Sequence, residues 1–231
     1  MGLSLQSPRF HPSHTKAAKS SDQELHYSNI PISREIWQEI CSQPQLTKLS
    51  LISCQITTIP NEIQNLKSLE VLDLSKSDVK FISENLYNLP LKVLNLSSTR
   101  VMSLSSKVSQ LRTLEDLNVS DTPLKELPKE IYDLKSLKSL NLSGLSVDLK
   151  AKHFNNLSSL STLNLSKTQV SKLHRLSLDN LKLLDVSRTP VSSLPAKLPS
   201  DCTLNIAGCS INRSRLKSLK DHSKTITYRL K

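Results

Sequence analysis

The side chains that most often perform catalysis have no catalytic spacing in this 231-residue chain. Its six histidines form no HExxH pair and no visible Ser/His/Asp or Cys/His arrangement, which are the patterns of zinc proteases and nucleophilic hydrolases. The three glycines, Gly2, Gly144 and Gly208, are too few for a phosphate-binding P-loop or for GxGxxG. We therefore expect no catalytic residues, no cofactor, no bound metal, and a chain that is not an enzyme.

The cysteines favour neither zinc nor a disulfide framework. Cys41, Cys54, Cys202 and Cys209 have no CxxC spacing and no histidine cluster beside them. Free cysteine behaves as a small buried hydrophobe, so we expect these thiols to be reduced and buried. This cysteine pattern is typical of a reducing compartment.

Polar side chains recur along the chain at regular intervals instead. An Asn or Asp returns every 21 to 23 residues, at Asp73, Asn95, Asn118, Asn141, Asn164 and Asp185. Charged residues that vary from repeat to repeat accompany them, at Lys48, Lys76, Arg100, Asp116, Asp121, Lys167 and Arg188. Amides, carboxylates and cationic groups on a fixed spacing form hydrogen bonds and ion pairs, which is the chemistry of recognition.

A repeated unit positions these residues, and its clearest copy is Leu114–Ser136. Copies begin at Leu46, Leu69, Leu91, Leu114, Leu137, Leu160 and Leu181, with a final strand near Asp201. Apolar residues stand three and five residues after each start, which predicts one short strand per copy. A single copy cannot bury these side chains, whereas stacked copies can, at about 1.5–3 kcal/mol for each fully buried aliphatic.

The unit LxxLxLxxTxLxxLPxxIxxLxx resembles a leucine-rich repeat, over roughly residues 46–212. The resemblance implies an α/β fold, a leucine-rich repeat solenoid that forms a right-handed horseshoe with a parallel β-sheet on its concave face. The longer coils resemble Ras-group and plant intracellular repeats, and the last coil resembles bacterial effector repeats. Positions three, five, seven and eight of each coil face the concave side, so the recurring polar and charged residues above are the predicted partner-binding residues. An edge, a cap or the convex face remains an alternative binding surface.

The other half of each coil is expected to vary. Pro60 and Pro128 precede apolar residues at helical spacing, and Pro at the first helical position predicts short helices over 59–66 and 127–134. Two prolines over 192–200 predict an extended segment there. The ninth position carries Ser, Thr or Cys in most coils but Leu145 in the coil 137–159, which we expect to be locally irregular.

Four segments are predicted. Residues 1–22 are a disordered Ser/Lys-rich leader, and residues 23–45 are an N-terminal helical cap with Ser33 as N-cap and the only Trp. Residues 46–212 form seven to eight coils. Residues 213–231, which hold much of the net charge of +11, form a basic C-terminal cap.

We expect a non-enzymatic protein–protein interaction module that is monomeric and binds another protein. The leader suggests a secreted bacterial effector that binds a host protein. One alternative is the repeat remnant of a ubiquitin-ligase effector that lacks its catalytic domain. Another is binding of nucleic acid or anionic membrane by the basic tail, although nucleic acid is not the expected partner. No apolar run could span a membrane or act as a Sec signal, so we expect a cytoplasmic protein or one exported into a host cell.

Overall fold

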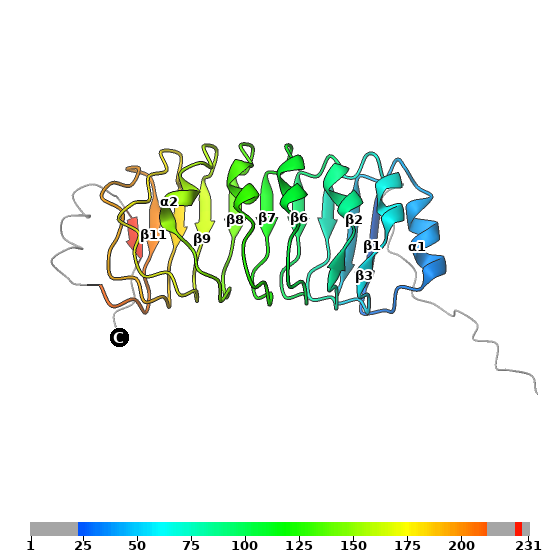
Figure 1. The fold of residues 1–231 in the computed structure, drawn as a ribbon, viewed down its shortest axis with the longest axis horizontal. Helices are drawn as coiled ribbons and strands as arrows, with labels where there is room; N and C mark the ends of the chain where they lie inside the picture. Colours follow the sequence, from blue (N-terminus) through cyan, green and yellow to red (C-terminus); the bar gives the residue numbers. More distant parts are fainter. Residues whose placement is uncertain (1–22, 212–224, 228–231) are drawn as a thin grey trace, which may run out of the picture.

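The computed structural model describes residues 23–211 and 225–227. Ten parallel strands form one sheet, in which strands pair with their neighbours along the chain (Figure 1). They are β1 Glu24–Ser28, β2 Lys48–Ile52, β4 Val71–Asp73, β6 Val93–Asn95, β7 Asp116–Asn118, β8 Ser139–Asn141, β9 Thr162–Asn164, β10 Leu183–Asp185, β11 Thr203–Asn205 and β12 Thr225–Thr227. One short strand per coil, stacked in parallel, confirms the predicted solenoid.

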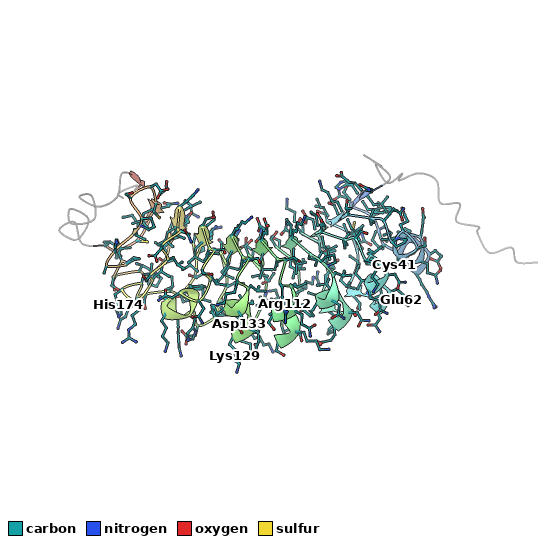
Figure 2. The ribbon with its side chains drawn as sticks, turned by 90° about the horizontal axis from the view of Figure 1, so that it is seen from above. Cys41, Glu62, Arg112, Lys129, Asp133 and His174 are labelled. Carbon is teal, nitrogen blue, oxygen red and sulfur yellow. The ribbon has the colours of Figure 1, made fainter. Side chains whose placement is uncertain are left out.

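Short helices lie on the side opposite the sheet. They are α1 Arg34–Cys41, α2 Ala151–Phe154 and four 3₁₀ turns, η1 Asn61–Asn65, η2 Glu84–Asn88, η3 Ser106–Gln110 and η4 Lys129–Asp133. A two-stranded sheet pairs β3 Thr58–Ile59 with β5 Phe81–Ile82. Figure 2 shows the molecule as an arch, with the strands on its concave side and the helices on its convex side.

The core consists of leucines stacked in columns. In the ten-stranded sheet, each strand from β2 to β11 has an inward-facing leucine that is at most 1% exposed, at Leu49, Leu72, Leu94, Leu117, Leu140, Leu163, Leu184 and Leu204. Pairing in register brings each of them beside the equivalent leucine of the next coil. Burial that only a neighbouring coil can provide makes stacking the main source of stability.

A side-chain hydroxyl closes the turn after β4, β6, β7, β9 and β10. Thr99, Thr122, Thr168 and Thr189 donate to the carbonyl three residues earlier, at 2.6–2.8 Å. Leu145 has no hydroxyl at this position, yet β8 pairs in register with both neighbours and Leu145 is 1% exposed. The expected irregularity of the coil 137–159 is therefore absent on the concave side. Its convex half differs, because α2 stands where the four preceding coils have a 3₁₀ turn.

The prediction for residues 23–45 was incomplete. Helix α1 begins as expected, because the Ser33 hydroxyl accepts a hydrogen bond from the Ile36 N–H at 3.3 Å. Strand β1 precedes it, however, and pairs in register with β2, with Leu25 beside Leu49. These residues thus form a further coil of the stack as well as covering its end.

Smaller predictions have mixed outcomes. Pro60 and Pro128 are N-caps, and 3₁₀ turns follow them in place of α-helices. Residues 192–200 contain no helix, as expected. Cys41, Cys54 and Cys202 are buried free thiols, whereas Cys209 is only partly buried. Burial raises the pKa of Cys41 and of Cys202 to about 11, which keeps both protonated. The predicted leader and most of the predicted basic cap lie outside the described residues.

Candidate binding surface

Register in the sheet turns each coil position into a row across the concave face. Asp73 of β4 pairs with Asn95 of β6, which pairs with Asn118 of β7. Asn141, Asn164 and Asp185 continue the same row through β8, β9 and β10. The structure therefore brings six of the predicted binding residues together, about 5 Å apart, which is the ordinary spacing of paired strands.

This row has a structural task as well. In each of the six residues a side-chain oxygen accepts a hydrogen bond from the backbone N–H two residues later, at 2.8–3.1 Å. Such Asx bonds end a strand by satisfying a backbone donor that the next strand does not reach. All six side chains are half-buried. The row is therefore a rigid base whose exposed atoms are the same in most coils.

The variable charged residues lie at the end of the strands, in a left-handed turn. Lys76, Asp121, Lys167 and Arg188 all stand at position eight, with φ between 53° and 60°. All four are exposed. We call these four residues the strand-end rim. The other coils have Asn29, Ser53, Ser98, Gly144 and Gly208 at this position, also with positive φ.

The remaining predicted residues have partners. Lys48 pairs with Glu24 at 3.9 Å, and Arg100 pairs with Asp78 at 2.9 Å. Asp116 of β7 is half-buried, and burial raises the pKa of its carboxyl, an effect opposed by a hydrogen bond from Ser139. Exposed ion pairs are worth about 0–1 kcal/mol, so Lys48 and Arg100 remain free to exchange partners.

The rim has one acidic residue, Asp121, between basic residues on both sides. Asp121 shares its coil with Asp116, which makes this coil the acidic part of the concave surface. Lys76 lies two coils before it and Lys167 two coils after it, each about 10 Å away by strand spacing. Arg188 follows in the next coil. The arrangement can therefore contact an acidic, a basic and a second acidic group of a partner in that order.

Two features escaped the sequence-based reasoning. Leu183 of β10 is 37% exposed on the concave face, between Thr162 and Thr203 of the paired strands. The sequence contains a signal for this exposure. Of the adjacent pair Leu183-Leu184, only Leu184 is in register with the buried leucines, so Leu183 must point to the other side of the strand. The second feature is a pocket on the convex side lined by residues of the coils 137–159 and 160–180. Its cations are distant in sequence, so only the repeat alignment could have brought them together.

The described residues form neither a cluster of metal ligands nor a membrane-spanning helix. No group of three or more His, Cys, Asp or Glu side chains among them could hold a metal ion. No helix in the described part of the chain is long and apolar enough to cross a bilayer.

Comparison with known proteins is consistent with these coils. A family model described as Leucine Rich Repeat matches residues 45–66. A protein of Mus musculus, leucine-rich repeat and calponin homology domain-containing protein 1, is 36% identical over 80 residues, or 35% of this chain and 11% of that protein. Leucine-rich repeat-containing protein 3B of Homo sapiens is 43% identical over 65 residues, or 26% of this chain and 25% of that protein. The matches therefore span a quarter or less of these relatives.

Solved structures share the fold over most of the chain. A leucine-rich repeat protein of Leptospira interrogans gives a TM-score of 0.61 at 24% identity, over 90% of this chain and 73% of that one. A plant peptide hormone receptor in complex with RGF2 gives 0.64 at 21% identity, over 94% of this chain and 38% of that one. An internalin of Listeria monocytogenes gives 0.64 at 15% identity, over 83% and 57%. With its stacked, in-register coils and these similar structures, the chain has a leucine-rich repeat fold.

Proposed function

We propose that the chain is a non-enzymatic protein-binding module whose partner lies across the concave face and the strand-end rim. The observation that carries the proposal is the presence of charged residues in the left-handed turn. The left-handed conformation costs a non-glycine residue roughly 1–2 kcal/mol. Lys76, Asp121, Lys167 and Arg188 all adopt it, where glycine would be free of that cost. Residues held against a local preference tend to mark functional surfaces.

Rigidity supports the same proposal. The row from Asp73 to Asp185 anchors the strand ends by Asx bonds, so the rim side chains project from a fixed base. Preorganisation of this kind lowers the entropy lost on binding. The fitting partner presents acidic groups to Lys76, Lys167 and Arg188, a basic group to Asp121, and an apolar side chain to Leu183.

A comparative interaction experiment tests the proposal. Wild-type protein and the variants Asp121→Lys and Lys167→Glu are crosslinked to partners in an extract, and the bound proteins are quantified by mass spectrometry. We expect at least one partner that wild type binds and both variants lose by about tenfold, since that factor corresponds to 1.4 kcal/mol.

Matched controls come from the convex face. Asp133 and Lys129 are exposed there and carry the same charges (Figure 2). Asp133→Lys and Lys129→Glu change the net charge identically and should leave that partner bound. Equal loss in the convex controls would show a general charge effect and contradict the concave assignment.

Export as a bacterial effector is a finer prediction that depends on residues 1–22. A reporter protein fused to these residues should leave the cell through a host-directed secretion system. Retention of the reporter would end that interpretation and leave the binding proposal unaffected.

A further inference from the structure

A pocket of about 350 Å³ lies between the coils 137–159 and 160–180. It has a simple structural origin. The first of these coils carries α2 on its convex side, while the second, which is two residues shorter, has no helix among residues 171–180. Two stacked coils of unequal convex depth leave a hollow between them. Figure 2 shows His174, one of the lining residues, on this convex side near the C-terminal end of the arch.

The lining is strongly basic. Lys150, Lys152, Lys172 and Arg175 contribute to it, against one acid, Asp148. Lys150 pairs with Asp148 at 3.7 Å. In the described part of the chain no ion pair engages Lys152, Lys172 or Arg175, and all three are exposed. The pocket therefore has three cations without a counter-charge.

Other hydrogen-bonding side chains complete the lining. Gln169, Ser171 and His174 place an amide, a hydroxyl and an imidazole among the cations. Guanidinium and ammonium groups beside such donors bind tetrahedral oxyanions well, because a guanidinium can donate two parallel hydrogen bonds to one anion. A carboxylate carries one charge, whereas a phosphomonoester carries about −1.5 to −2 at neutral pH and three acceptor oxygens. The excess of three cations fits the phosphate better.

The positive charge is confined to the pocket, and acidic residues lie around it. This favours a small anionic group over an extended anionic partner. The preceding coil presents Glu126, Glu130 and Asp133 on the same convex side as its lysines, so its charge is balanced. Asp179 follows the pocket in the chain, and Asp148 lies at the pocket itself. A nucleic acid or an anionic bilayer would extend over these acids and be repelled. A single phosphate group avoids them.

We infer that this convex pocket binds a phosphorylated side chain of a partner protein, with Lys152, Lys172 and Arg175 as its phosphate-binding residues. The site is separate from the concave face and does not depend on the binding proposed there. It takes one phosphate, and the peptide on either side of that phosphate runs over the convex surface.

The test uses the full chain and three kinds of probe: peptide libraries, inorganic phosphate, and phosphatidylserine-containing vesicles. Degenerate peptide libraries with one central phosphoserine, phosphothreonine or phosphotyrosine are compared with the same libraries unphosphorylated. Inorganic phosphate is titrated into isotope-labelled protein, and backbone amide shifts are followed by NMR. We expect phosphorylated peptides to be retained at least about tenfold over unphosphorylated ones, given the strength of charge-assisted hydrogen bonds. Phosphate should shift the amides of residues 149–152 and 169–175.

Variants locate the binding. Lys172→Glu combined with Arg175→Glu should reduce phosphopeptide retention by about tenfold or more, since like charges at the pocket repel the ligand. Lys129→Glu is the matched control, because Lys129 occupies in the preceding coil the position that Lys152 and Arg175 occupy in theirs, yet does not line the pocket. It should retain binding within about twofold, as expected for a peripheral charge screened by salt. Asp121→Lys on the concave face should also retain it.

Four results would overturn the inference. The first is equal retention of phosphorylated and unphosphorylated libraries. The second is loss of binding in Lys129→Glu as large as in the double variant. The third is binding only to phosphatidylserine-containing vesicles, which would assign the cations to a membrane. The fourth is that phosphate shifts only backbone amides that lie outside the pocket. Circular dichroism and thermal unfolding of the double variant establish that it is folded before binding is compared.

Discussion

The carboxylate of Asp121 lies where a Cβ on Gly144 would stand. Both residues occupy position eight of their coils, and both have positive φ. The Asp121 side chain thus leans over the backbone of the next coil, and glycine at position 144 leaves the space for it. Gly208 occupies the same coil position but leaves a hypothetical Cβ 3.6 Å from the nearest side-chain atom, in Arg188.

Substitution of these two glycines should therefore have unequal effects. Gly208→Ala should cost about 1–2 kcal/mol of unfolding free energy, the price of a left-handed alanine. Gly144→Ala should cost clearly more, because the methyl group also displaces the Asp121 carboxylate. Urea unfolding of both variants provides the comparison. In an Asp121→Ala background the cost of Gly144→Ala should fall to that of Gly208→Ala, and an unchanged cost there would contradict the steric explanation.

At position eight, glycine should be more stabilising than valine, which is the reverse of their order in a strand. Lys167 has φ of 57°, so Lys167→Gly should be neutral or stabilising by up to about 1 kcal/mol, while a β-branched Lys167→Val should be destabilising. Lys48 lies in β2, where extended backbone favours valine over glycine. Thermal unfolding of the four variants should show opposite orders at the two sites. The same order at both would mean that backbone conformation is not the deciding factor.

The hydrogen bond from a side-chain hydroxyl that closes the turn after five of the strands can be tested at Thr122. Thr122 donates to the Val119 carbonyl at 2.8 Å and is 7% exposed. Thr122→Val keeps the shape and leaves that carbonyl without this donor, so it should cost about 1–3 kcal/mol. Thr122→Ser keeps the donor and loses only a methyl group, so it should cost less. Chemical denaturation distinguishes the two, and a larger cost for serine would indicate that packing outweighs the hydrogen bond.

Tyr132 should make stability depend on alkaline pH. Its ring packs against Phe154 at 5.4 Å, and burial, with a smaller effect of the Asp148 carboxylate, raises its pKa to about 12. The folded state thus favours the protonated phenol. Its stabilising contribution is complete below the unfolded pKa near 10 and is lost as the pH rises towards about 12.

Tyr132→Phe should remove part of that loss, on the order of 2 kcal/mol between pH 9 and 12, and change little at pH 7. Unfolding free energies of both proteins over this range provide the measurement. Burial also raises the pKa of Tyr27 and Tyr87, so some dependence should remain in the variant. Identical pH profiles for the two proteins would contradict the assignment to Tyr132.

Most of the fold was predictable because the same hydrophobic pattern occurs in each coil of the repeat. The inward leucines, the position of each strand and the concave rows all follow from the spacing of residues such as Leu117 and Val119. Strand β1 escaped prediction because Leu25 and Tyr27 lack the Leu-rich signature of later coils, although both are buried. Its register with β2 is set by stacking, which a local pattern does not encode.

The candidate surface was predictable in location but not in role. The Asn and Asp row could be placed on the concave face, but its Asx bonds depend on backbone geometry at residues such as Ser97 and Ser120. The left-handed turn at Lys76 and Lys167 was equally invisible, because lysine gives no sign of positive φ. We also predict that amide exchange is faster in the coil 137–159 than in the coil 114–136, and the regular pairing of β8 places any difference in the convex half.

The in-register rows fix the distances between rim residues of different coils. Each coil advances the rim by one strand spacing, about 5 Å, so the distance between Asp121 and Lys167 is set by the number of coils between them. Removing the coil 137–159 as a unit would shorten that distance by one strand spacing. Each remaining coil would still have a neighbour to stack on. For the concave binding proposed above, selectivity would then change through the spacing of the rim charges, with Asp121 and Lys167 both preserved. Duplication or loss of single coils is thus a route by which relatives could retune partner choice without altering their binding chemistry.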